Sequence, residues 1–133
     1  MTFHTQELGG IRVLELPAEG PRVEHPTDLI SLAFEHRAEL LAIPVERLGE
    51  TFFKLASGLA GELVQKFVNY RIRLAILGDI SAHVESSKAL RSFVYESNRG
   101  SHLWFLEDRE ALAARLTGGR SESERTRAPV PQR

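Results

Sequence analysis

The feature that most constrains the fold is an apolar helical stripe followed directly by an apolar strand pattern. Between residues 57 and 70, apolar residues recur every three or four positions and predict a helix with one wide face on a sheet: Leu59, Ala60, Leu63, Val64, Phe67 and Val68. Residues 72–77 are almost all apolar and end at Gly78-Asp79, which predicts a buried strand. A one-sided helix leading into a buried strand is typical of α/β folds.

Similar elements precede and follow this pair. Gly9-Gly10 predicts a tight turn between strands at 2–8 and 11–16. Further along we predict a helix at 27–38 with Thr27 as its N-cap, a strand at 40–45, a helix from Ser86 or Ser87 to Asn98, a strand at 103–106 and a helix at 109–117. Residues 46–56 show no clear period, although Phe52 and Phe53 are expected to pack on the helix that follows.

These elements give the order ββαβαβαβα. We therefore expect the α/β class, with a mixed, mainly parallel sheet, an N-terminal β-hairpin and flanking helices. The 133 residues are enough for one domain, which we assign to residues 1–117. Residues 118–133 are expected to form a disordered tail, because no apolar residue occurs from Gly118 to Arg127.

Composition excludes several functions. Lys and Arg total 17 and Asp and Glu total 18, so a net charge of −1 gives no basic surface for nucleic acid or an anionic membrane. The chain has no cysteine, and its five histidines lack the spacing of metal ligands, so we expect neither a metal nor another cofactor. No leader pattern or membrane-length apolar run occurs, and we expect a cytoplasmic protein.

The first candidate site lies where the helix over 57–70 begins. Unpaired N–H groups at a helix start suit an anion, and Ser57, Gly58 and Gly61 would let a phosphoryl group approach the backbone. The alternative is that Ser57 only caps the helix and the glycines let it lie close to the sheet. In particular, we expect Gly61 to be a packing position beside the apolar stripe.

The second group of candidates follows from the parallel sheet. Asp79 and Ser81 come just after a strand, at the carboxyl edge where ligands gather in open α/β sheets, although Asp79 could simply cap a turn. Glu96 and Asn98 lie in a polar run at a helix end, where Glu96 could instead pair with Arg99 on the surface. Ser57, His83 and Asp79 have no arrangement that would favour a catalytic triad.

Three stretches of the chain carry a resemblance to a known family: residues 55–71 (LASGLAGELVQKFVNYR), 75–79 (AILGD) and 87–100 (SKALRSFVYESNRG). With these, residues 10–116 are identified as a member of a bacterial family of uncharacterised proteins, domain of unknown function 4180. This family name implies no activity.

A weaker resemblance concerns function. The order of elements is similar to that of STAS domains of sulfate transporters and anti-sigma-factor antagonists, which carry Asp-Ser-Ser-Gly-Leu-Gly where a helix follows a central strand. Ser57 matches the phosphorylated serine, whereas Leu55, Ala56 and Ala60 replace other motif residues. This resemblance implies a STAS-like fold and a non-enzymatic regulatory or protein-interaction module, switched at Ser57, with a protein partner or a homo-oligomer. The alternative is a small-molecule-binding protein or enzyme that uses Ser57, Asp79 and Glu96.

Overall fold

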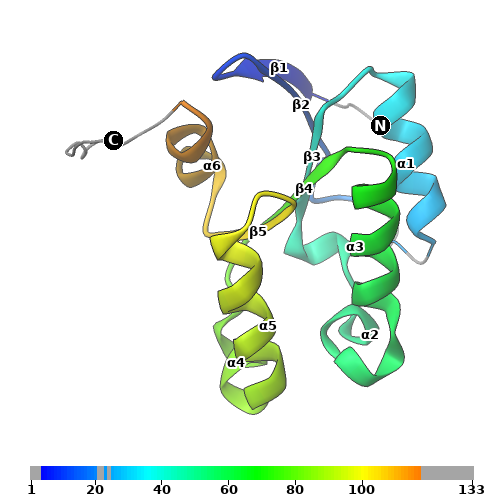
Figure 1. Ribbon diagram of the computed structural model, residues 1–133. Helices are drawn as coiled ribbons and strands as arrows, with labels where there is room; N and C mark the ends of the chain where they lie inside the picture. The colour runs from blue at the N-terminus through cyan, green and yellow to red at the C-terminus, as the bar shows by residue number, and fades with distance from the viewer. Residues whose placement is uncertain (1–3, 21–22, 24, 118–133) are drawn as a thin grey trace.

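The computed structural model describes residues 4–20, 23 and 25–117, which form a five-stranded sheet with helices on both faces (Figure 1). The strands are β1 (His4–Leu8), β2 (Ile11–Glu15), β3 (Leu40–Pro44), β4 (Arg73–Leu77) and β5 (Leu103–Leu106), and they lie in sequence order across the sheet. The pair β1–β2 is antiparallel and the other pairs are parallel, which confirms the predicted hairpin and mixed sheet. The predicted tail, 118–133, lies outside the described residues.

Four helices match the predicted pattern, and two short ones were not predicted. The four are α1 (Pro26–Glu35), α3 (Leu59–Asn69), α5 (Lys88–Arg99) and α6 (Arg109–Leu116). The two additional helices are α2 (Glu50–Phe53) and α4 (Ser81–Ser86), and two 3-10 turns, η1 (Val45–Arg47) and η2 (Leu55–Ser57), complete the description. Phe52 and Phe53 are buried in α2, which contacts α3 as expected.

The sheet separates two apolar clusters. From β2 to β5, each parallel strand is followed by a crossover to the next strand, and such crossovers are right-handed. They therefore place α1, α3 and α5 on the same face of the sheet. Leu29, Leu63 and Leu90 of these helices belong to the larger cluster. The smaller cluster contains Leu112 of α6 and Trp104 of β5, so α6 covers the opposite face. Figure 1 shows α6 across the sheet from α1 and α3.

Two predicted helix starts are wrong. Helix α1 has His25 at its N-cap and Pro26 as its first residue, a position that suits proline because its N–H would be unpaired anyway, so Thr27 is not the cap. The helix ends at Glu35, and Arg37, with φ +57°, turns the chain away. Helix α3 begins at Leu59, because Gly58 adopts a left-handed conformation with φ +83° and separates Ser57 from the helix.

The expectation that Gly61 packs against the sheet is also wrong. Ala60, Leu63 and Phe67 are the buried residues of α3, and Gly61 follows Ala60 by one position, about 100° around the helix. Gly61 is exposed, and a Cβ atom there would meet nothing within 4 Å. The buried stripe is therefore narrower than predicted, and Val68 is 37% exposed.

Candidate functional site

The carboxyl ends of β4 and β5 lie side by side and position the candidate site. Leu77 pairs with Leu106, and the Gly78 N–H donates to the Leu106 carbonyl at 3.0 Å. Gly78 has φ +142°, and a Cβ atom there would lie 2.9 Å from Cγ1 of Val45. Glycine is therefore required where the chain leaves the sheet, and Asp79 and Glu107 follow at the same edge.

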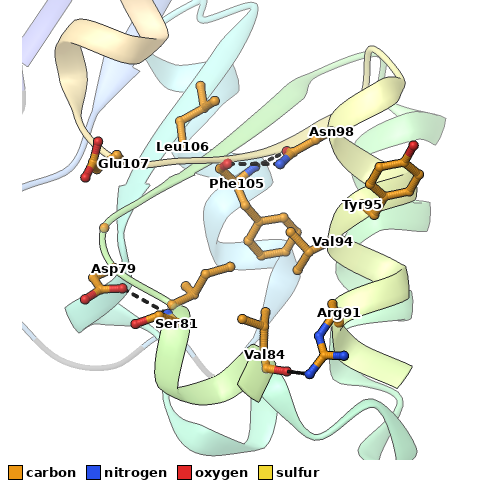
Figure 2. Close-up of a pocket in the computed structure, with 12 residues that line it drawn as sticks. Asp79, Ser81, Val84, Arg91, Val94, Tyr95, Asn98, Phe105, Leu106 and Glu107 are labelled. Atoms are coloured by element: carbon orange, nitrogen blue, oxygen red, sulfur yellow. Dashed lines mark hydrogen bonds between the residues drawn. The ribbon is translucent and has the colours of Figure 1, made fainter. Parts of the chain in front are cut away.

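A pocket of about 490 Å³ lies beyond this edge, between the β4–α4 segment, α5 and the end of β5 (Figure 2). We call it the carboxyl-edge groove. It is lined by Gly78, Asp79, Ile80, Ser81, Val84, Arg91, Val94, Tyr95, Asn98, Phe105, Leu106 and Glu107. The groove therefore brings together three of the predicted site residues, Asp79, Ser81 and Asn98.

Asp79 is exposed and held in place by the start of α4. Its Oδ1 accepts a hydrogen bond from the Ser81 N–H at 2.9 Å, so the aspartate caps the turn, as the alternative interpretation predicted. The backbone hydrogen bond from Ser81, with a further one from the Ser81 side chain, lowers the pKa of Asp79 below its ordinary value. The carboxylate is therefore ionised near neutral pH and acts as an acceptor.

Asn98 forms hydrogen bonds with the backbone at the free edge of β5. Its Nδ2 donates to the Phe105 carbonyl at 3.2 Å, and its Oδ1 accepts from the Phe105 N–H at 2.7 Å. Because β5 is an edge strand, the side-chain amide takes the place of a neighbouring strand at this residue. Asn98 thus fixes α5 to β5 beside the groove.

The interior of the groove is apolar, and its rim on α5 is not. Ile80, Val84 and Val94 pack against the larger apolar cluster, which contains the buried Phe105. On α5, Nη2 of Arg91 donates to the Val84 carbonyl at 3.2 Å, which connects α5 to α4 across the groove. Tyr95 is 62% exposed, a large fraction for an aromatic ring beside an apolar pocket.

Ser57 lies outside the groove. It is exposed at the end of η2, where its hydroxyl donates to the Thr51 carbonyl at 2.8 Å and accepts from the Leu59 N–H at 3.3 Å. Ser57 therefore links α2 to the start of α3. Gly58 and Gly61 are exposed nearby, and neither lines the groove.

Glu96 also lies outside the groove, on the exposed face of α5. It lines a separate pocket of about 350 Å³ with Arg91, Ser92 and Tyr95. The suggested Glu96–Arg99 pair does not form; instead, the Arg99 guanidinium lies over the Tyr95 ring, 5.6 Å from its centroid. Glu96 therefore does not join Asp79 in the groove, although the two pockets share Arg91 and Tyr95.

Several groove residues were not predicted from the sequence. Glu107 follows β5 just as Asp79 follows β4, so the rule for carboxyl ends of parallel strands could have identified it. On α5, Arg91, Val94 and Tyr95 were missed, although they recur at helical spacing with the predicted Asn98 and share one face with it. That spacing was the available signal, and it gained meaning only once β5 was known to lie beside this face.

Two features are absent from the part of the chain that the structure describes. In it, no three His, Asp or Glu side chains come together as a metal ion would require. No helix in the same residues combines the length and apolar character needed to cross a membrane.

Comparison with known proteins gives one match. Neither the curated proteins nor the solved structures contain a match to this chain. The STAS-like resemblance therefore stays a prediction. The model of the family described as "Domain of unknown function (DUF4180)" matches residues 8–116, most of the chain. The chain belongs to the DUF4180 family.

Proposed function

We propose that this domain is a non-enzymatic regulatory module that binds a partner protein at the carboxyl-edge groove. The observation that carries the proposal is an apolar pocket with an exposed tyrosine on its rim. Tyr95 is 62% exposed beside Val94 and Phe105, and aromatic side chains at the edge of an apolar pocket are typical anchors of protein interfaces. The partner would place an apolar side chain in the groove and cover the Tyr95 ring.

The alternative function, a small-molecule-binding protein or enzyme built on Ser57, Asp79 and Glu96, has less support in the geometry. Only Asp79 of these residues lines the groove. Its lowered pKa keeps it ionised, which suits the binding of a donor or cation rather than proton donation near neutral pH. A second copy of this chain is another possible partner, and the mass of the protein in solution distinguishes it from a different protein.

Two exposed tyrosines provide a matched test of the groove. Tyr95 lies on its rim, whereas Tyr70, 51% exposed, packs edge to face with Phe34 at the end of α3. We expect Tyr95→Ala to weaken binding of the native partner at least about tenfold, as for an interface anchor. Tyr70→Ala should leave that affinity unchanged. The measurement is the affinity of each purified full-length variant for a protein captured from the native cell.

Two results would contradict the groove as the binding surface. One is a Tyr95→Ala protein that binds the partner as tightly as the wild type does, when Tyr95→Ala and Tyr70→Ala both melt at the wild-type temperature. The other is loss of binding in Tyr70→Ala alone, which would place the partner on the surface of α1 and α3.

Ser57 is proposed as the regulatory position of the same module. Its exposure supports access by a kinase, and its hydroxyl donates to Thr51, a bond that a phosphate ester on that oxygen could no longer make. Phosphorylation would thus release a link between α2 and α3 and add about −1.5 to −2 charges at the same point.

A chain of contacts connects Ser57 with the groove. Ser57 bonds Thr51 of α2, and Phe53 of α2 stacks on His83 of α4, with ring centroids 4.0 Å apart and planes 8° from parallel. Helix α4 contributes Ser81 and Val84 to the groove lining. A change at Ser57 could therefore move α4 through α2 without any contact between Ser57 and the partner.

Substitutions at Ser57 and His83 test the switch. Ser57→Ala removes the bond to Thr51 and should lower the free energy of unfolding by about 1 kcal/mol. We expect Ser57→Asp to change partner affinity, and His83→Ala, which removes the stack on Phe53, to abolish that change. If wild type, Ser57→Ala and Ser57→Asp bind the partner equally well, Ser57 is not a switch.

A further inference from the structure

We infer that the carboxyl-edge groove receives a partner segment in which an apolar side chain stands next to a lysine or arginine. This inference rests on the proposed function and specifies the chemistry of the partner. The apolar interior of the groove and the charges on its two sides carry it, and both are visible in Figure 2.

The interior accepts an apolar side chain. Ile80 lines it at the N-cap of α4, Val84 lines it from α4 and Val94 from α5, and Phe105 closes it from β5. A volume of about 490 Å³ falls within the range of pockets that enclose a small ligand, about 300–1,000 Å³. The groove can therefore hold a large aliphatic or aromatic side chain together with part of its neighbour.

The strand side of the groove carries two carboxylates. Asp79 and Glu107 follow adjacent parallel strands, both are exposed, and Figure 2 shows them on the same side of the pocket. Within residues 4–20, 23 and 25–117, neither of the groove carboxylates takes part in an ion pair, whereas Glu15 pairs with Arg109. A cation near both would gain two attractions without replacing an ion-pair partner, and Oδ1 of Asp79 could keep its hydrogen bond from the Ser81 N–H.

The helix side of the groove has the opposite character. Arg91 is the cationic residue of the lining, and its Nη2 is held by the Val84 carbonyl, across the groove from Asp79. Its remaining N–H groups suit a backbone carbonyl of the partner. The groove is thus polarised: the basic side chain of the partner is directed to the strand side, and its backbone acceptors to Arg91 on α5.

Three capped peptides test this assignment with the full-length protein: acetyl-Leu-Arg-Leu-amide, acetyl-Leu-Gln-Leu-amide and acetyl-Leu-Glu-Leu-amide. Amide NMR signals are followed during each titration. The arginine peptide should shift signals of residues 80–84 and 94–98 and bind about three- to tenfold tighter than the glutamine peptide, as two solvent-exposed ion pairs allow. The glutamate peptide should bind most weakly, and raising the salt concentration should reduce the differences.

Charge variants distinguish an effect of the groove carboxylates from an effect of the net charge of the protein. The double variant Asp79→Asn/Glu107→Gln should lose the preference for arginine. Its matched control, Glu7→Gln/Glu62→Gln, removes the same charge from exposed residues of β1 and α3 and should keep the preference.

The possible results distinguish this inference from the proposed function. Equal affinities of the three peptides, with signals shifting at the groove, overturn the inference and leave the groove as an interaction surface. Binding of acetyl-arginine-amide as tight as that of the arginine tripeptide identifies a small cation as the occupant and also overturns it. Shifts elsewhere, with none at the groove for any peptide, contradict both proposals.

Discussion

At the scale of single residues, two glycines have opposite roles that the sequence does not distinguish. Gly61 stands in an exposed turn of α3 with open space around it, and Gly78 stands at φ +142° against Val45. Both glycines adjoin apolar segments. From the local pattern, the packing role was predicted for Gly61, whereas Gly78 is the one that lies against a neighbour. The difference depends on backbone conformation and on a neighbour more than 30 positions away in sequence, which no local pattern contains.

The two glycines give a paired prediction for stability. Gly61→Ala should raise the free energy of unfolding by about 0.5–1 kcal/mol, because alanine favours an exposed helical position over glycine. Gly78→Ala should lower it by about 1–3 kcal/mol, through backbone strain and the approach to Val45. Thermal or urea unfolding of the two variants measures both effects. If Gly61→Ala destabilises the protein, Gly61 lies on the packed face of α3 after all.

At the scale of elements, α6 is the helix that covers the smaller apolar cluster. Arg109 forms a bidentate ion pair with Glu15 of β2 at 2.8 and 2.9 Å, and Arg115 lies 4.4 Å over the Trp104 ring and donates to the Asn98 carbonyl. Its far end meets the β1–β2 turn, where a Cβ atom on Gly9 would overlap the Leu116 carbonyl. Helix α6 therefore ties β5, β2 and the hairpin together.

The hairpin glycines test how closely α6 docks. Gly9 and Gly10 both have positive φ, at +57° and +80°, but Gly10 has open space where Gly9 touches Leu116. Alanine at either position incurs left-handed strain of about 1–2 kcal/mol. Gly9→Ala should destabilise by about 1–3 kcal/mol more than Gly10→Ala, because only the former displaces α6. Equal unfolding free energies of the two variants would show that α6 does not contact the turn.

The elements also show what the sequence could predict. Strands β2 to β5 and the helices α1, α3, α5 and α6 contain repeated apolar residues, and their existence was predicted correctly. Strand β1 has only Leu8 as an apolar residue, and the Gly9-Gly10 turn was the signal that predicted it. Helices α2 and α4 have four and six residues, too few for a helical period to emerge. The start of α3 was misplaced because the left-handed Gly58 stands between Ser57 and the helix, a conformation that the apolar pattern does not reveal.

At the scale of the whole molecule, the strand order decides where binding can occur. Helices α1, α3 and α5 cover one face of the sheet and α6 the other, while the Asn98 amide occupies part of the free edge of β5. The carboxyl edge beyond β4 and β5 combines an apolar pocket, two carboxylates without an ion pair in the described residues and an exposed tyrosine. Asp79 was predictable from its place after a strand, and Asn98 was predicted from the polar run at the end of its helix. Arg91, Val94 and Tyr95 of α5 could be identified only from the folded arrangement.

The most direct test of the groove as the binding surface is amide hydrogen exchange of the full-length protein with and without its captured partner. The account predicts slower exchange in the partner complex for residues 80–86 and 91–98. It predicts unchanged exchange for the β1–β2 hairpin, because none of the groove-lining residues belongs to it. Slower exchange confined to α1 and the end of α3, with the groove segments unchanged, would contradict it.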